Sequence, residues 1–235
     1  HGAGGIWVLN PPYLLFYPDA DGDGVPDASP QVRLSGFGLQ DTHSVANSML
    51  FGPDGWLYGA NGSTTTGNVS SAVSKGVSFE GQCIWRYHPK THVFEIYAEG
   101  GGNTFSLEID SLGRVFSGTN HGGTRGLYYP QGSYATKNWG KHGPLSNPHA
   151  LGYLEHMKSE GDARRFPQAF CIYEGGLLPR DFDGTIIAPN SLHNLVWNSQ
   201  LFADGSGFRT QDRENLLETD DRWFRPVYAG VGPDG

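Results

Sequence analysis

Four aspartates at short, regular spacing form the densest group of potential ligands in the chain. Within the stretch DADGDGVPD, Asp19, Asp21 and Asp23 are two positions apart, and Asp27 follows after four more. Carboxylate oxygens at this spacing can converge on one hard cation, while the intervening glycines permit a tight backbone path. The pattern resembles the start of an EF-hand loop without its later glutamate. We therefore predict a Ca²⁺ site that staples an exposed loop, with a solvated acidic turn as the alternative.

A second group of polar residues stands where predicted strands begin or end. His43 precedes one apolar strand in DTHSVANS, and Asn103 precedes another in GGGNTFS. His121 follows a strand in GTNHGG, with Arg125 nearby. A histidine in such a place can take a proton from a substrate hydroxyl, because its pKa lies near working pH. The alternative is that each is an ordinary loop residue, bonded to nearby backbone.

The elements that would position these residues are repeated hairpins. The stretch NSMLFGPDGWLYGANG (47–62) has an apolar strand, a Pro-Asp-Gly turn that Gly55 closes, and a second strand. The stretch FSLEIDSLGRVFSGTN (105–120) repeats this plan with Gly113 in place of Gly55, and VGPDG (231–235) begins a third copy. Repeated sheets that cannot bury both faces alone are typical of a β-propeller.

The remaining segments fit the same plan. We expect an opening hairpin over 6–17, a strand over 31–34, a second blade over about 44–98 and a third over about 103–139. A fourth blade is expected from strands at 170–173, 185–188, 194–197 and 207–210, and a fifth begins at 224–231. We expect a loop without regular structure over 62–81, a connection from Lys141 to Gly161, and a short helix over 151–158. The fold class predicted is all-β: a β-propeller, six-bladed in the parent protein and truncated here to about four blades.

Composition narrows the function. The 235 residues carry 16 basic and 24 acidic side chains, for a net charge of −8. This balance argues against a nucleic-acid groove or an anionic membrane surface as partner. No apolar run approaches the roughly 20 residues of a membrane span. Cys83 and Cys171 each lie in an apolar strand pattern, which favours two buried free thiols, although a disulfide stays open.

Long stretches of the chain resemble a bacterial family of membrane-bound dehydrogenases found in Planctomycetes and Verrucomicrobia. The resemblance covers nearly the whole chain and is carried by GIWVLNPPYLLFYPDADGDGVPD, GFGLQDTHSVANS, GPDGWLYGANGST, GGGNTFSLEID, HGPLSNP, YEGGLLP and WFRPV. It implies one propeller domain over residues 1–235, incomplete at both ends. It also implies a periplasmic or cell-envelope location and a c-type haem domain elsewhere in the parent chain.

The wider group is similar to soluble quinoprotein glucose and sorbosone dehydrogenases, six-bladed propellers that oxidise sugars with pyrroloquinoline quinone (PQQ) and Ca²⁺. In that group a catalytic histidine precedes a strand ending in Gly-Pro-Asp-Gly, and His43 matches its placement. Asn103 matches the Asn of the group's Arg-Asn pair. His121, Gly122 and Gly123 resemble its His-Gly-Pro segment, whose carbonyls bind Ca²⁺.

Two positions depart from the group's pattern. Gly102 stands where the arginine that holds the quinone is expected, and Gly123 replaces the proline. We count Arg125 with the cofactor-binding candidates because it lies close to the His-Gly-Gly segment. PQQ carries three carboxylates and needs cationic partners.

The resemblance implies an oxidoreductase that acts on a sugar or an alcohol. His43 would remove the hydroxyl proton, PQQ would take the hydride, and electrons would pass to the haem domain. A non-catalytic, Ca²⁺-stabilised propeller that binds carbohydrate or protein is the alternative.

Overall fold

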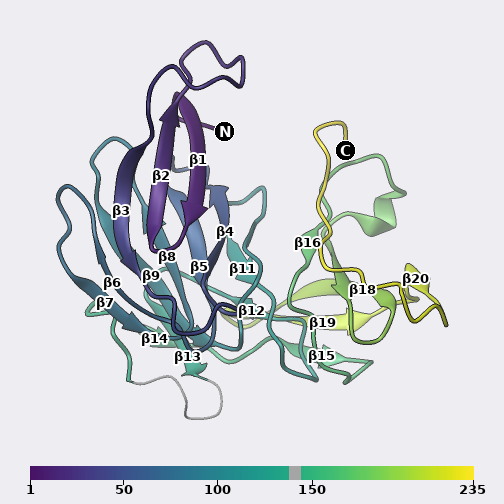
Figure 1. The fold of residues 1–235 in the computed structure, drawn as a ribbon. Helices are drawn as coiled ribbons and strands as arrows, with labels where there is room; N and C mark the ends of the chain where they lie inside the picture. Colours follow the sequence, from purple (N-terminus) through teal and green to yellow (C-terminus); the bar gives the residue numbers. More distant parts are fainter. Residues whose placement is uncertain (138–143) are drawn as a thin grey trace.

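The described residues fold into four β-sheets, and the strands of the first two sheets are interleaved along the sequence (Figure 1). The computed structural model describes residues 1–137 and 144–235. Within these ranges there is no α-helix, and one 3₁₀ helix, η2, spans Arg180–Phe182. The same residues include no helix of the length and apolar character that a membrane span requires. The predicted all-β class is confirmed.

The first sheet has five strands in the order β1-β2-β3-β6-β7. The predicted opening hairpin is present and continues into β3. The predicted loop over 62–81 is wrong, because this stretch supplies the two strands that complete the sheet. Its alternation is weak in the sequence, and Val69 and Phe79 are its buried apolar residues. The strands are β1 (Gly5–Asn10), β2 (Tyr13–Pro18), β3 (Gln31–Phe37), β6 (Thr66–Ser70) and β7 (Val77–Glu80).

The second sheet contains the predicted second blade as four antiparallel strands, β4-β5-β8-β9. Two further strands extend it in parallel, and Tyr134 of β13 pairs with Glu99 of β9. The prediction that the stretch near Tyr134 completes the third blade is therefore wrong. The strands are β4 (Ala46–Phe51), β5 (Leu57–Asn61), β8 (Cys83–Tyr87), β9 (Phe94–Gly101), β13 (Ser133–Lys137) and β14 (Gly152–Tyr153).

The third sheet is small and the fourth is large. The third consists of β10 (Glu108–Ile109), β11 (Val115–Ser117) and β12 (Leu127–Tyr128). The end of the predicted third blade at Trp139, the start of the next connection at Lys141 and the first two residues of HGPLSNP lie outside the described residues. The fourth sheet follows the predicted fourth blade, in the order β15-β19-β18-β17-β16 with β20 beside β18. Its strands are β15 (Lys158–Glu160), β16 (Cys171–Ile172), β17 (Thr185–Asn190), β18 (Leu195–Asp204), β19 (Gly207–Asp212) and β20 (Leu217–Glu218).

Two predictions of local structure are wrong at the sheet edges. The helix predicted over 151–158 is replaced by β14 and the start of β15. The Leu154 N–H donates to the Tyr134 carbonyl at 2.9 Å, and the Met157 N–H donates to the Gly126 carbonyl at 2.9 Å. These partners are distant in sequence, so tertiary pairing overrides the local preference. The strand predicted over 224–231 is absent, since 219–235 contains no strand.

Each core is shared between two neighbouring sheets, which explains why the sheets pack side by side. Trp7 and Phe16 of the first sheet pack with Trp85 and Tyr87 of the second. A second cluster joins the second sheet to the third, and a third cluster joins the third to the fourth through Phe116. The described sheets do not close into a ring, so the arrangement is propeller-like.

The hairpins that repeat along the chain close as their turn residues predict. Gly55 and Gly113 have φ values of +80° and +76°, and Gly184 takes the equivalent place in the fourth sheet with +74°. Only glycine adopts this region at little steric cost. All three turns therefore require glycine, which has no side chain to clash in this conformation. Cys83 and Cys171 are both buried and free, as predicted.

Candidate functional site at the strand entrances

One end of the second, third and fourth sheets gathers the loops on which most of the predicted site residues lie. Three asparagines occupy equivalent places there: Asn61 at the end of β5, Asn120 shortly after β11, and Asn190 at the end of β17. Each follows its turn glycine by six or seven positions and bonds to a loop beside it. We call this end the entrance face. Asn61 and Asn190 are fully buried, and their amides hold these loops in place.

Asn103 is the link between loops of the second and third sheets. Its Oδ1 accepts a hydrogen bond from the Ser63 N–H at 3.0 Å, and its own N–H donates to Asn120 Oδ1 at 3.2 Å. Gln168, from the loop before β16, donates to the Asn103 carbonyl at 3.5 Å. Asn103 therefore lies between three loops of the entrance face.

His43 lies at the same face, on the loop before β4. The Gly62 N–H donates to the carbonyl of the adjacent Ser44 at 3.1 Å, and Gly62 is the neighbour of Ser63, which contacts Asn103. The His43 side chain is 94% exposed, and its Nδ1 lies 3.5 Å from Asp41 Oδ1. His43 and Asn103 thus lie at one end of the molecule, as a shared site requires.

Asp41 is the anchor of this histidine. Its Oδ2 accepts a hydrogen bond from Thr64 Oγ1 at 2.6 Å, and its Oδ1 accepts one from the His43 N–H at 3.0 Å. The hydrogen bond from Thr64 is the main reason that the pKa of Asp41 is lowered, followed by the bond from the His43 backbone. Asp41 is therefore held as a carboxylate that faces the imidazole. On the sequence alone this pair is too weak a signal to count, because an aspartate two positions before a histidine is common in loops.

His121, Gly122 and Gly123 form a loop that packs against the irregular stretch before β16. The Gly123 N–H donates to the Ala163 carbonyl at 3.2 Å, and the same carbonyl lies 2.4 Å from the place where a Gly122 Cβ would be. Gly122 therefore has no room for a side chain. The His121 ring lies 4.8 Å from the His156 ring, between centroids. Burial lowers the pKa of His156 to about 4, so this partner stays neutral near pH 7.

Arg125 is fully buried and acts as a bridge between the third and fourth sheets. Its Nη2 lies 2.5 Å from Asp212 Oδ2, and its Nε donates to Asp212 Oδ1 at 3.2 Å. Further donors meet the carbonyls of Thr124 and Asp162, and the guanidinium lies 4.0 Å from the centre of the Trp197 ring. These partners account for its charge within the protein. The prediction that Arg125 binds a cofactor does not agree with this geometry.

Two cavities lie beside Phe105, the residue that lines both of them. The first, of about 240 Å³, is lined by residues that include Phe105, Gln168 and Ser191. The second, of about 290 Å³, lies on the other side of Phe105 and contains Glu108. Residues 226–231 contribute to the lining of both, and Figure 1 shows this C-terminal segment running beside β16. Burial raises the pKa of Glu108 to about 7.

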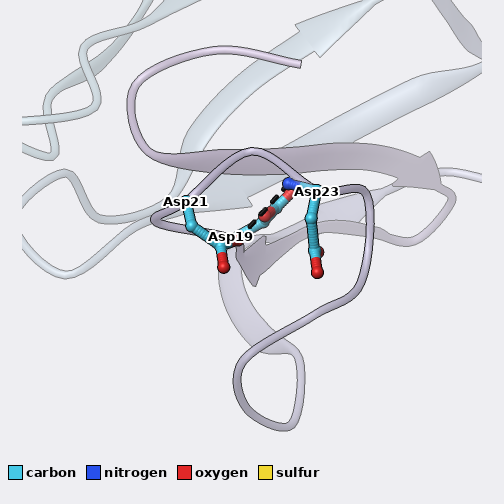
Figure 2. A group of neighbouring side chains, drawn as sticks. All are labelled: Asp19, Asp21 and Asp23. Carbon is cyan, nitrogen blue, oxygen red and sulfur yellow. Dashed lines mark hydrogen bonds between the residues drawn. The ribbon is translucent and has the colours of Figure 1, made fainter.

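The acidic loop lies far from the entrance face, beyond the opposite end of the first sheet (Figure 1). One carboxylate oxygen from each of Asp19, Asp21 and Asp23 lies within 4.8 Å of the others (Figure 2). The Asp19 side chain is fully buried and accepts bonds from the N–H groups of Gly22 at 3.0 Å and Gly24 at 3.2 Å.

Asp27 has a different place in this loop. It is outside the three-residue cluster, and its Oδ2 accepts a bond from the Ala20 N–H at 2.8 Å. Its own N–H donates to the Pro18 carbonyl at 2.8 Å. Asp27 therefore closes the loop at its base, and its predicted role as a metal ligand does not agree with this position.

Comparisons with known proteins place the chain in a family and support its fold. The chain belongs to the family described as a domain of unknown function (DUF7133), whose model matches residues 2–235. No curated protein matches the chain. It is similar to a crystal structure described as that of a "putative oxidoreductase (glucose dehydrogenase)" from Thermus thermophilus, with 18% sequence identity and a TM-score of 0.52. The match covers 100% of this chain and 76% of that chain. At this identity the likeness shows a shared fold.

Proposed function

We propose that this domain is an oxidoreductase that removes hydrogen from a hydroxyl-bearing carbon of a sugar or an alcohol at the entrance face. The observation that carries the proposal is the exposed His43 imidazole with Nδ1 3.5 Å from the Asp41 carboxylate. The shared fold with a structure described as a glucose dehydrogenase supports the reaction class. Fold alone does not determine function, so the pair of side chains has the greater weight.

The chemistry of the pair suits proton removal. When the Nδ1–H of a neutral His43 points toward Asp41, the Nε2 lone pair is free to accept a hydroxyl proton. The Asp41 carboxylate then stabilises the imidazolium that forms, as in other His–Asp pairs. Thr64 keeps Asp41 in place through its 2.6 Å hydrogen bond. Other side chains on the loops of the entrance face would hold the remaining hydroxyl groups of the substrate.

The positions that the resemblance assigns to PQQ do not supply its cationic partners, although the exposed Arg165 lies at this face beside Asn190. A ligand with three carboxylates needs cationic partners. Gly102 has no side chain to offer, and the guanidinium of Arg125 is buried against Asp212. This chain is therefore assigned only the binding of substrate and the removal of the proton. The hydride leaves to a two-electron acceptor, and onward transfer to a c-type haem domain in the cell envelope belongs to the same proposal.

Ca²⁺ in the acidic loop is a separate proposal about stability. Three carboxylate oxygens within 4.8 Å of one another repel strongly unless a cation lies between them. Of the three carboxylates, Asp19 has the greatest need of a compensating positive charge, because its side chain is fully buried. Oxygen ligands of this kind fit Ca²⁺, which would fasten the loop without taking part in the reaction.

Dye-linked oxidation of sugars and alcohols by the full-length protein tests the proposed reaction. His43→Ala should lower kcat/KM by about 10²- to 10⁴-fold, the usual contribution of a general base. Asp41→Asn should lower it less and change its pH dependence. His193→Ala is the matched control, since His193 is also at the entrance face and has no carboxylate partner among the described residues. If no substrate gives turnover, or if His43→Ala and His193→Ala behave alike, a non-catalytic carbohydrate-binding propeller is the better description.

A further inference from the structure

A groove opens beside β9 of the second sheet, because the first part of β9 extends beyond its neighbour β13. β9 begins at Phe94, but β13 pairs with it only from Glu99 onward. The Gly132 N–H donates to the Tyr97 carbonyl at 2.8 Å and so limits the groove on one side. The resulting cavity, of about 550 Å³, is lined by Glu95, Ile96, Tyr97, Gln131, Gly132, Asn147, Pro148, His149, Ala150 and Leu151. This volume is within the range of small-molecule sites.

The groove is separate from the candidate active site. Phe94 pairs with Tyr87, and Tyr87 pairs with Leu57 beside the Gly-Pro-Asp-Gly turn. Asn61 marks the opposite end of β5, at the entrance face. A ligand in the groove therefore does not meet His43.

Glu95 is a carboxylate that the protein holds in one orientation. Its Oε1 accepts hydrogen bonds from Arg86 Nε at 2.8 Å and from Arg86 Nη2 at 2.6 Å. Arg86 is fixed in turn by stacking, with its guanidinium carbon 4.3 Å from the Trp56 ring centre and 5.1 Å from that of Tyr97. Both donors meet one oxygen, so Glu95 Oε2 keeps its capacity to accept a bond from a ligand.

Three further polar side chains complete the set. Gln131 and His149 are exposed, and within residues 1–137 and 144–235 their side chains have no hydrogen-bond partner. Asn147 Oδ1 accepts a bond from the His149 N–H at 2.9 Å, and this leaves its NH₂ group available. Amide and imidazole groups that are not used by the fold are the usual means of orienting a polar ligand in an otherwise apolar pocket.

The charged side chains of the groove favour an uncharged ligand. Its carboxylate is paired with Arg86, which weakens the attraction for a cation. No unpaired lysine or arginine lines the described groove to bind an anion. Pro148 and Leu151 supply apolar surface, and Leu151 is 85% exposed. Paired apolar and hydroxyl-bonding surfaces match the faces and edges of a pyranose ring.

We propose that this groove binds a neutral oligosaccharide, and that it does so independently of the entrance face. Glu95, Gln131, Asn147 and His149 would form hydrogen bonds with hydroxyl groups, while Pro148 and Leu151 would contact the C–H face of a sugar ring. The site would hold a saccharide chain on the domain whether or not the domain oxidises it.

Binding of neutral di- to tetrasaccharides with gluco, manno and galacto configuration tests this site. The full-length protein is titrated at millimolar sugar by calorimetry and by saturation-transfer NMR. The double variant Gln131→Ala/His149→Ala should weaken binding by at least about tenfold, since each lost hydrogen bond contributes about 1 kcal/mol. Both side chains are exposed, so folding should be unaffected, which thermal melting verifies.

The controls separate this site from the proposed reaction. His43→Ala should bind the oligosaccharide like the wild type, even if it loses all dye reduction. The site is refuted if none of the sugars binds. It is also refuted if His43→Ala abolishes binding while the double variant retains it, because the sugar then binds at the entrance face.

Discussion

The ion pair between Arg125 and Asp212 allows a strong test of how the third and fourth sheets are held together. Asp212→Asn keeps the size of the side chain and removes its charge. The guanidinium of Arg125 is fully buried, so the substitution leaves a positive charge without its counter-ion. The bonds from Arg125 to the carbonyls of Thr124 and Asp162 remain and do not neutralise it.

The magnitude follows from the burial of the pair. Removing one partner of a buried, hydrogen-bonded ion pair costs about 3–5 kcal/mol. The cost should lie toward the upper end, because Asp212 also accepts bonds from Ser199 Oγ at 2.7 Å and the Asp162 N–H at 2.8 Å. In a domain of this size each kcal/mol lowers Tm by roughly 2–4 °C, so we expect a fall of about 10 °C or more.

Chemical denaturation and calorimetry measure this change, and an exposed pair provides the control. Arg213 and Asp181 lie 2.9 Å apart with side-chain exposures of 32% and 60%. Asp181→Asn should therefore cost less than about 1 kcal/mol. If Asp212→Asn costs no more than Asp181→Asn, the buried pair does not hold the two sheets together and the reasoning is wrong. The pair Arg125→Met with Asp212→Leu should recover part of the lost stability, since no charge is then left buried.

Two further predictions concern the acidic loop and the inner cavity. A chelator should lower Tm of the wild type, whereas Asp19→Asn should abolish this effect, and an unchanged wild-type Tm would exclude a bound metal in the loop. Glu108 has a pKa raised by burial to about 7 from 4.5, so its neutral form is favoured in the folded state. The stabilisation that Glu108 gives to the folded state is therefore complete below the pKa of the unfolded chain and is lost as the pH rises. The free energy of unfolding should fall by on the order of 2–3 kcal/mol between about pH 4.5 and pH 7. Glu108→Gln should flatten this part of the stability curve, and an equally steep curve in the variant would assign the change to another group.

Local patterns in the sequence determined the hairpins. The turns at Gly55 and Gly113 require a positive φ, and each is flanked by apolar residues that alternate or run together. Both signals act over a few residues, so they are legible without the rest of the chain. The same holds for the three aspartates that come together in the acidic loop, since the last is only four positions after the first.

Tertiary structure decided which strands join which sheet and what several site residues do. Residues 66–80 became strands because β3 offers an edge, and the stretch at 151–158 paired with sheets in place of forming a helix. Arg125 proved to be a buried bridge because Asp212, 87 positions later, reaches it. Pairing and burial of this kind depend on partners that lie far apart in the sequence, so local propensity cannot predict them.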